Sequence, residues 1–212
     1  MEMADSCDVT YDDEAVLAER IVRGAIRAFR LHPYHDVDAS VVAETSGLDT
    51  AVVERVFPIW DALLLVTYDR WTQLRGTRRS VEPASTVDHV RLTLAEDVAD
   101  PGLVRLLAGV VSIAASERDF AELFRKRFEE HVEQLTAGLE RDVASGAEHI
   151  GIPTHQAATQ LLAVHEGLQV QMLVRPYLDA LVEFDRAVRT LRQGWRAPEP
   201  VAWDLDSALA SI

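Results

Sequence analysis

Cysteine is nearly absent from this sequence, since Cys7 is the only one among 212 residues. A single thiol cannot form a disulfide within the chain, and no CxxC pair or Cys/His cluster is available to build a structural zinc site. Because stable disulfides belong to oxidising compartments, we predict a protein of the cytoplasm. We predict neither a bound metal nor a cofactor.

Long apolar runs are also absent. No stretch approaches the roughly 20 continuous apolar residues that a membrane-spanning helix needs. Residues 1–14 contain six acidic residues, no basic residue and no apolar run, so we expect neither a signal peptide nor a membrane anchor here. The sequence gives no reason to expect a membrane partner.

Recognisable catalytic motifs are a third absence. The sequence has no ExxH or HExxH pair, no glycine-rich phosphate loop and no GxSxG element, the arrangements that bind metals, cradle phosphates or expose a nucleophile. Its seven histidines and many carboxylates could in principle form a site, but they make no catalytic constellation. We predict that the protein is not an enzyme.

Positive charge is scarce, because 21 Lys and Arg face 35 Asp and Glu, a net charge of −14 at pH 7. A protein that binds nucleic acid broadly presents a basic face to the phosphates, so this balance argues against non-specific binding. Residues 15–75, however, contain eight acidic residues and seven arginines. That stretch is close to neutral, which permits a small local contact with DNA.

Helical periodicity is what the sequence has in abundance. Ala, Leu, Val, Glu and Arg recur at three- and four-residue spacings along most of the chain, and alternating runs typical of strands are missing. Hydrophobic residues make up 48% of the chain, enough for a substantial core. We predict an all-α fold in which an N-terminal three-helix head precedes a larger helical body.

The N-terminal part divides at helix caps and breakers. Residues 1–12 are predicted to be a disordered acidic arm, and the first helix is expected to begin with Asp12 or Asp13 as N-cap and to run to about Leu31. Its apolar stripe comprises Leu17, Ile21, Val22, Ala25, Ile26 and Phe29.

Two short helices and one longer helix should follow in the head. The short ones are expected over 38–47 and 49–57, with Asp38 and Asp49 as N-caps and Gly47 in the left-handed position after the first of them. The longer helix should run from about Asp61 to Gly76. Two short helices joined by a turn with glycine form a helix-turn-helix unit, predicted here over residues 13–76.

The remaining residues, 77–212, are predicted to form a helical body. A polar segment with Gly and Pro, 75–86, is interpreted as the linker between head and body. Breakers then delimit five helices, expected at 84–98, 102–116, 118–145, 154–175 and 177–194. Residues 196–212 are predicted to be an irregular tail packed on the body.

The order of residues from Ile21 to Leu65 resembles the TetR family of one-component transcriptional repressors. The matching positions are Ala25, Phe29, Tyr34, Val42-Ala43-Glu44, Gly47-Leu48, Val53, Phe57-Pro58 and Asp61-Ala62-Leu63-Leu64. In the body, Glu166-Gly167-Leu168 also resembles the family's pattern. The resemblance implies a helix-turn-helix that binds operator DNA, an effector-binding and dimerisation body, and regulation by a small molecule.

Most matched residues would pack the head, so they predict the fold and not the function. The resemblance places the DNA-facing surface at Ser40, Asp49, Thr50, Glu54, Arg55 and Trp60, where the family's usual lysines and recognition-helix tyrosine are missing. Asp49 can equally be a helix cap and Trp60 a packing residue. Glu54 either accepts from a cytosine amino group or repels phosphates. Arg55, supported by Thr50, Ser40 and Tyr34, contacts guanine or phosphate, or is simply solvated.

Two body helices carry the candidate ligand-binding residues, which are Phe124, Phe128, His131, His165, Gln169 and Met172. An apolar wall with a few polar groups is typical of a small-molecule pocket, and its phenylalanines favour an apolar or aromatic effector. The alternatives are a plain core stripe with a histidine satisfied by one neighbour, and, for the later helix, a dimer interface or free surface.

Apolar residues on the last two long helices predict a homodimer through residues 154–194, as the resemblance also implies. Two such heads would meet successive major grooves of an operator. The leading hypothesis is a repressor that a small apolar effector releases from double-stranded DNA. The alternative is a TetR-like small-molecule or protein-binding module with weakened or lost DNA binding, which the acidic arm, Glu54 and the missing lysines favour.

Overall fold

The computed structural model describes residues 8–78, 83–116 and 120–196. Over these residues the chain forms nine α-helices, one 3-10 helix and no strand, which confirms the predicted all-α fold. The elements are α1 (Asp8–Leu31), η1 (Tyr34–Asp36), α2 (Ala39–Ser46), α3 (Thr50–Val56), α4 (Trp60–Arg78), α5 (Thr86–Ala99), α6 (Gly102–Ala114), α7 (Ala121–Ser145), α8 (Thr154–Val174) and α9 (Ala180–Trp195).

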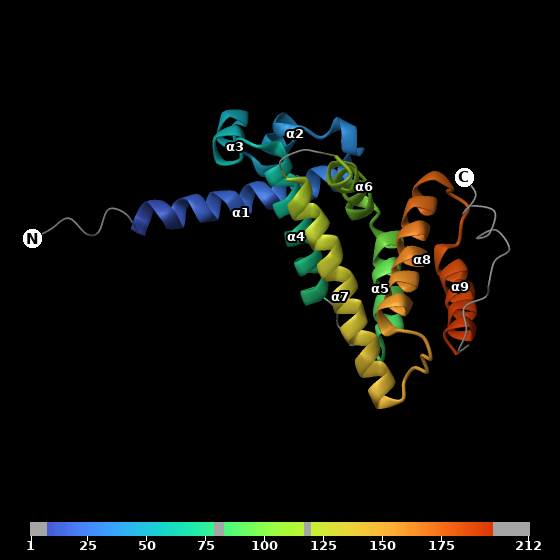
Figure 1. Ribbon diagram of the computed structural model, residues 1–212. Helices are drawn as coiled ribbons and strands as arrows, with labels where there is room; N and C mark the ends of the chain where they lie inside the picture. The colour runs from blue at the N-terminus through green and yellow to red at the C-terminus, as the bar shows by residue number, and fades with distance from the viewer. Residues whose placement is uncertain (1–7, 79–82, 117–119, 197–212) are drawn as a thin grey trace, which may run out of the picture.

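The helices are arranged as a head and a body joined by α4 (Figure 1). In the head, α1 packs against α2, α3 and α4. In the body, α5, α7, α8 and α9 pack on one another, with α9 at the outer edge, and α6 lies between the body and the head (Figure 1). Among the described residues, no helix is long and apolar enough to cross a membrane.

The first helix begins earlier than the sequence suggested. It starts at Asp8 and not after an N-cap at Asp12 or Asp13, so that prediction is wrong, and the expected disordered arm 1–12 is helical from Asp8 onward. Residues 1–7 of the arm lie outside the described residues.

The caps of the two short helices were predicted in part. The Asp38 carboxylate accepts from the backbone N–H groups of Ser40 and Val41, and Gly47 has the left-handed φ of 65°. Asp49 occupies the N-cap position of α3, but its side chain makes no capping hydrogen bond. Asp49 is therefore a cap by position only.

Local caps also set the body helices close to their predicted bounds. Ser85 accepts from the backbone N–H of Asp88 at the start of α5, and Asp179 accepts from Val182 at the start of α9. These caps place the two starts a few residues later than predicted. Of the tail predicted over 196–212, only Arg196 lies within the described residues.

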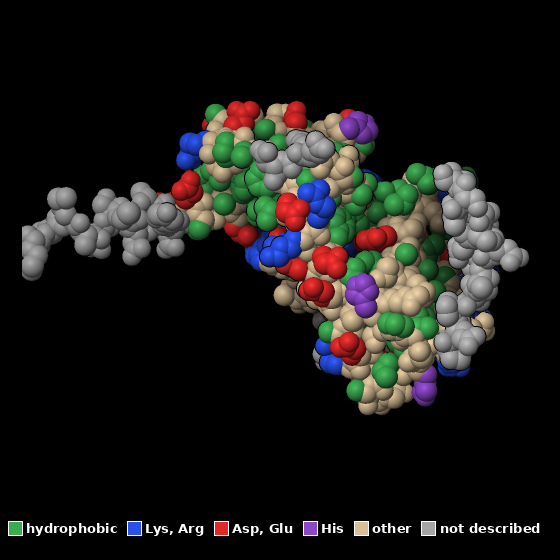
Figure 2. Space-filling view, viewed as in Figure 1, with side chains coloured by type: hydrophobic (Ala, Val, Ile, Leu, Met, Phe, Trp, Pro, Cys, Tyr) green, Lys and Arg blue, Asp and Glu red, His purple; other side chains and the backbone are tan. Residues whose placement is uncertain are grey.

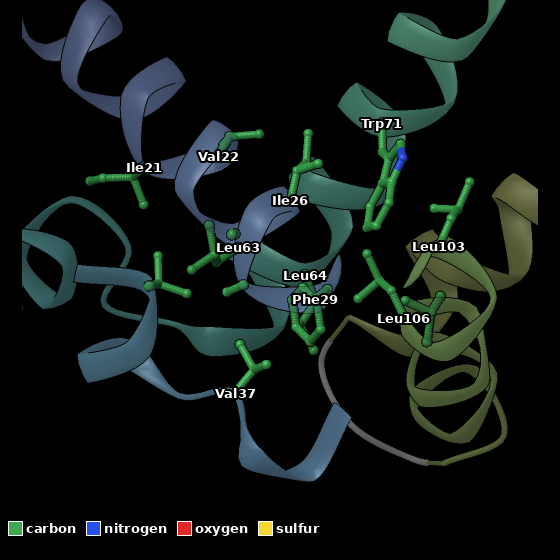
Figure 3. Close-up of a cluster of buried hydrophobic side chains, with 14 of the residues drawn as sticks. Ile21, Val22, Ile26, Phe29, Val37, Leu63, Leu64, Trp71, Leu103 and Leu106 are labelled. Atoms are coloured by element: carbon green, nitrogen blue, oxygen red, sulfur yellow. The ribbon is translucent and has the colours of Figure 1, made fainter. Parts of the chain in front are cut away.

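One hydrophobic cluster joins the head to the body. Figure 3 shows its side chains from α1, α4 and α6, among them Phe29, Trp71 and Leu106. Helix α6 approaches the head closely because two of its residues lack a side chain: a Cβ at Gly102 would lie 2.8 Å from Trp71, and one at Gly109 would lie 2.1 Å from the Tyr34 ring. The head thus shares its core with α6.

A second cluster belongs to the body alone. Buried apolar side chains of α5, α7, α8 and α9 meet there, with Phe184 and Trp195 among the most deeply buried. The Trp195 indole N–H donates to Gln160 at 2.9 Å, which ties α9 to α8. This cluster holds α8 in place, and α8 carries several of the candidate ligand-binding residues.

Candidate functional sites: a helix-turn-helix surface and a body cavity

Arginines of α1 hold the helix-turn-helix in position. Arg20 donates to the backbone oxygens of Ser46 and Gly47, both at 2.8 Å, and Arg27 donates to that of Thr45. Since the last carbonyl groups of a helix lack partners within it, these bonds satisfy the C-terminal end of α2. They also fix α2, and therefore the turn into α3, against α1.

The six predicted DNA-facing residues lie in two different settings. Asp49, Glu54 and Arg55 are exposed on or beside α3, and Thr50 is half-buried at its start. Ser40 is exposed but its hydroxyl donates to the Asp38 carboxylate at 2.6 Å. Trp60 is half-buried at the start of α4, against the head core, so packing accounts for it.

Tyr34 lies away from that surface. Its ring stacks on Phe29, with centroids 5.7 Å apart, and faces Gly109 of α6. The tyrosine is therefore a contact between head and body in this structure. The exposed surface of α2 and α3 is mainly acidic, with Glu44, Asp49 and Glu54 beside the single exposed base Arg55, and acidic side chains stand out there in Figure 2.

A cavity of about 480 Å³ opens among α4, α5, α6, α7 and α8. Its size falls within the range typical of small-molecule sites, roughly 300–1,000 Å³. The structure brings five of the six predicted ligand-binding residues together on its wall: Phe124, Phe128, His131, His165 and Gln169. Met172 is absent from the wall and packs against the body core, because α8 has passed the cavity by that turn.

The cavity also has residues that the sequence reading missed. Tyr68, Arg75 and Arg127 come from α4 and α7, and Glu166 from α8. Glu166 was visible as part of the family-like motif, and its i, i+3 spacing from Gln169 could have placed it on the same helix face. The α4 residues had no such signal, since only the packing of α4 against the body turns them inward.

A buried network closes one side of the cavity. Arg75 donates to Asp97 at 2.6 Å, to Glu96 at 3.1 Å and to the backbone oxygen of Thr93 at 3.0 Å. Gln169 donates its amide N–H to the other Asp97 oxygen at 2.7 Å. Asp97 is fully buried, so this network connects α4, α5 and α8 through one carboxylate.

Burial governs the charge states around this network. Burial raises the pKa of Asp97, although the Arg75 guanidinium opposes the shift, and burial raises the pKa of Tyr68 to about 12. Burial lowers the pKa of His165 to about 3, so its imidazole is neutral at pH 7. The His165 Nε2 atom lies 3.7 Å from Asp97 and has no hydrogen-bond partner among the described residues.

No group of three His, Cys, Asp or Glu residues within the described ranges has the arrangement to hold a metal ion. The chemistry of the cavity is instead that of an apolar and aromatic chamber with a polar side. Such a site binds an organic molecule by burial and fixes its orientation by a few hydrogen bonds. The cavity lies between α4, which leads to the head, and the helices of the body.

Comparison with known proteins identifies the family. Residues 85–196 match the family model of the C-terminal domain of BetI-type transcriptional repressors, and no curated protein matches the chain. The match spans more than half of the sequence, and the chain belongs to the TetR family of transcriptional regulators. The resemblance read from the head is therefore confirmed.

Solved structures share the fold at low sequence identity. A TetR transcription regulator from Haloarcula marismortui is similar with a TM-score of 0.67 and 19% identity, over 85% of this chain and 98% of that one. FadR from Bacillus subtilis, in complex with stearoyl-CoA, has a TM-score of 0.63 and 14% identity over 83% and 98%. FadR from Thermus thermophilus, in complex with lauroyl-CoA, has 0.55 and 16% over 88% and 98%.

Proposed function

We propose that this transcriptional regulator is a repressor that binds an operator through α2 and α3 and leaves it when a small, largely apolar effector enters the body cavity. The observation that carries the proposal is the cavity of about 480 Å³, whose wall includes α4 and α6. Both of these helices pack on α1 of the head. A molecule that moves them changes the position of the head.

The path from cavity to head is short. Tyr68 and Arg75 of α4 line the cavity, while Trp71, between them in sequence, is buried in the head core. Arg30 of α1 lies over the Trp71 ring, 5.0 Å from its centroid, and a cation over an aromatic face is an attractive contact. A displacement of α4 by an effector is therefore passed to α1.

A homodimer through α8 and α9 completes the proposal. Their outer surface carries a groove of about 440 Å³ lined by Val164, Gly167 and Leu168, among others, and Val170 and Val174 beside it are 58% and 71% exposed. The groove is also lined by the polar Gln171, Arg175 and Glu183, and exposed apolar side chains next to polar ones are common where proteins contact each other. A second copy of the chain would cover it and set the spacing of the two heads.

The test of DNA binding is fluorescence anisotropy with the DNA upstream of the protein's own gene, at low salt, against a scrambled duplex. We expect sequence-preferring binding that Arg55→Ala weakens about 10- to 100-fold, the loss of one base or phosphate contact. Arg141→Ala removes another exposed arginine, on α7, and serves as the matched control. Its affinity should equal that of the wild type.

The second candidate function, a binding module without strong DNA affinity, is favoured by one observation. The surface of α3 presents Glu54 directly beside Arg55, both exposed, and a carboxylate near phosphates opposes binding. If wild type and Arg55→Ala both fail to prefer the upstream DNA at low salt, the repressor proposal is abandoned for this one. Glu54→Gln separates the readings further, because it strengthens binding to any duplex only if Glu54 repels phosphates.

A further inference from the structure

One buried acceptor on the cavity wall has no donor. Gln169 is only 6% exposed, and its side-chain oxygen has no hydrogen-bond partner among the described residues. The orientation of this amide is fixed, since its N–H group must face the Asp97 carboxylate at 2.7 Å. A buried polar atom without a partner costs about 1–3 kcal/mol, which a ligand that donates a hydrogen bond would recover.

A carboxylate stands beside that acceptor. Glu166 precedes Gln169 by three residues on α8, so the two side chains share one face of the helix, and both line the cavity. Glu166 is half-buried and makes no hydrogen bond or ion pair with any described residue. Burial raises the pKa of its carboxyl, because no neighbouring cation stabilises the charged form.

The two arginines of the cavity wall already form ion pairs with carboxylates of the protein. Arg75 donates to Glu96, Asp97 and the Thr93 backbone oxygen, and Arg127 donates to Asp69 and Glu130. Five carboxylates, those of Asp69, Glu96, Asp97, Glu130 and Glu166, thus lie near two guanidinium groups. Of these five, Glu166 is the one that forms no ion pair with either arginine. An anionic ligand would find no free cation in this part of the chain and would lie near an unpaired carboxylate.

Part of the cavity wall is apolar. It includes Leu103, Val104, Leu107, Val110, Phe124 and Phe128. Aromatic faces attract cations, and the aliphatic side chains accept a hydrocarbon body. The chamber is therefore built for a molecule with one apolar part and one end that carries both positive charge and hydrogen-bond donors.

We propose that the cavity binds a protonated primary amine with an apolar body, whose ammonium group donates to the Glu166 carboxylate and the Gln169 side-chain oxygen. This inference rests on the proposed function, since the amine would be the effector, and it narrows the effector to one chemical class. It also distinguishes this chain from the two FadR proteins, which were solved in complex with acyl-CoA molecules. Three N–H donors on one ammonium group suit two adjacent acceptors.

The test compares four ligands of equal chain length by isothermal titration calorimetry at pH 7.5: octylamine, octyltrimethylammonium, 1-octanol and octanoate. We expect octylamine to bind at least tenfold more tightly than each of the others. Octyltrimethylammonium keeps the charge but lacks N–H donors, and 1-octanol lacks the charge. Equal or tighter binding of any of these three, or no binding of octylamine, overturns the proposal.

Variants then locate the ammonium group. E166Q should weaken octylamine binding about 10- to 100-fold, the loss expected for a hydrogen bond to a charged group, and should leave 1-octanol binding unchanged. E129Q removes an exposed carboxylate of α7 outside the cavity and should bind octylamine like the wild type. E166Q should be at least as thermally stable as the wild type, because it removes an unpaired, half-buried charge, so weak binding would not reflect misfolding. Unchanged octylamine affinity in E166Q refutes the assignment.

Release from DNA is measured separately and keeps the two proposals distinct. If octylamine binds through Glu166 but does not lower the affinity for the upstream duplex, the ligand class stands and the repressor mechanism fails. If octanoate or 1-octanol releases the duplex and octylamine does not, the repressor mechanism stands and the ligand class fails.

Discussion

The contact between Gly109 and Tyr34 is where α6 meets the head, and one added methyl group tests it. A Cβ atom at position 109 would lie 2.1 Å from Tyr34 Cε2 and 2.2 Å from Cζ, far inside van der Waals contact. Gly109→Ala therefore forces the tyrosine ring out of its position against Phe29, on which it stacks with centroids 5.7 Å apart.

The magnitude follows from what the ring loses and what the helix gains. Loss of the stacked pair costs about 1 kcal/mol, and exposure of the covered part of a half-buried ring costs about 1–2 kcal/mol more. Alanine in place of glycine inside α6 returns up to about 1 kcal/mol of helix propensity. The free energy of unfolding should therefore fall by about 1–2 kcal/mol.

The assay is urea unfolding followed by circular dichroism, at one fixed protein concentration because the proposed dimerisation would make the measured stability depend on concentration. Gly109→Ala, Tyr34→Ala and the double variant form a cycle with an expected coupling of about 1 kcal/mol or more. Gly194→Ala is the control, since a Cβ there meets nothing within 4 Å. It should be as stable as the wild type or slightly more stable.

The double variant decides whether the reasoning is right. Once Tyr34 is alanine, nothing obstructs the methyl group, so Gly109→Ala should then be neutral or stabilising. An equal loss of stability in both backgrounds would mean that the tyrosine ring is not the obstacle, and that the close approach of α6 to the head has another basis.

Four further predictions concern the network around Asp97, the neighbouring His165, the proposed dimer and the turn of the head. Arg75→Met leaves the fully buried Asp97 with the Gln169 amide as its remaining side-chain donor and should lower the free energy of unfolding by about 3 kcal/mol. A loss below about 1 kcal/mol in urea unfolding would contradict a stabilising role of the Arg75–Asp97 ion pair. His165 has a pKa of about 3 when folded against about 6.5 when unfolded, so the unfolded state binds more protons between these values and stability falls as pH drops below 6.5. His165→Leu should remove up to about 1.4 kcal/mol per pH unit of that slope, measured as urea midpoints at pH 7 and 5.5. A Cβ at Gly167 meets nothing within 4 Å, so Gly167→Arg should give a folded monomer in light scattering. The control Ala144→Arg, at an exposed position of α7, should stay dimeric. A dimeric Gly167→Arg would show that the interface does not include Gly167. Gly47→Ala places a side chain at φ 65° and should cost about 1–2 kcal/mol, seen as a lower thermal midpoint.

Local rules account for what the sequence predicted well. Asp38 and Gly47 begin and end α2 as expected, because capping and left-handed glycine are decided within a few residues. The apolar stripe of α1 and the spacing from Ala25 to Leu64 determine which faces pack in the head, and this was enough to recognise the family. The same locality explains why helix ends were predicted only to within a few residues, as at Asp8 and Ala180.

The tertiary structure decided what depends on residues far apart in the chain. Arg75 meets Asp97 and Asp97 meets Gln169 only because α4, α5 and α8 pack together, and no periodicity in the sequence shows this. Phe124, His165 and Gln169 were candidates from helical spacing, yet their common cavity and the free acceptors within it arise from that packing. By itself, the sequence determined a helical regulator with a helix-turn-helix head. The charge and polarity of its chamber were set by long-range contacts, whose partners a linear sequence does not place side by side.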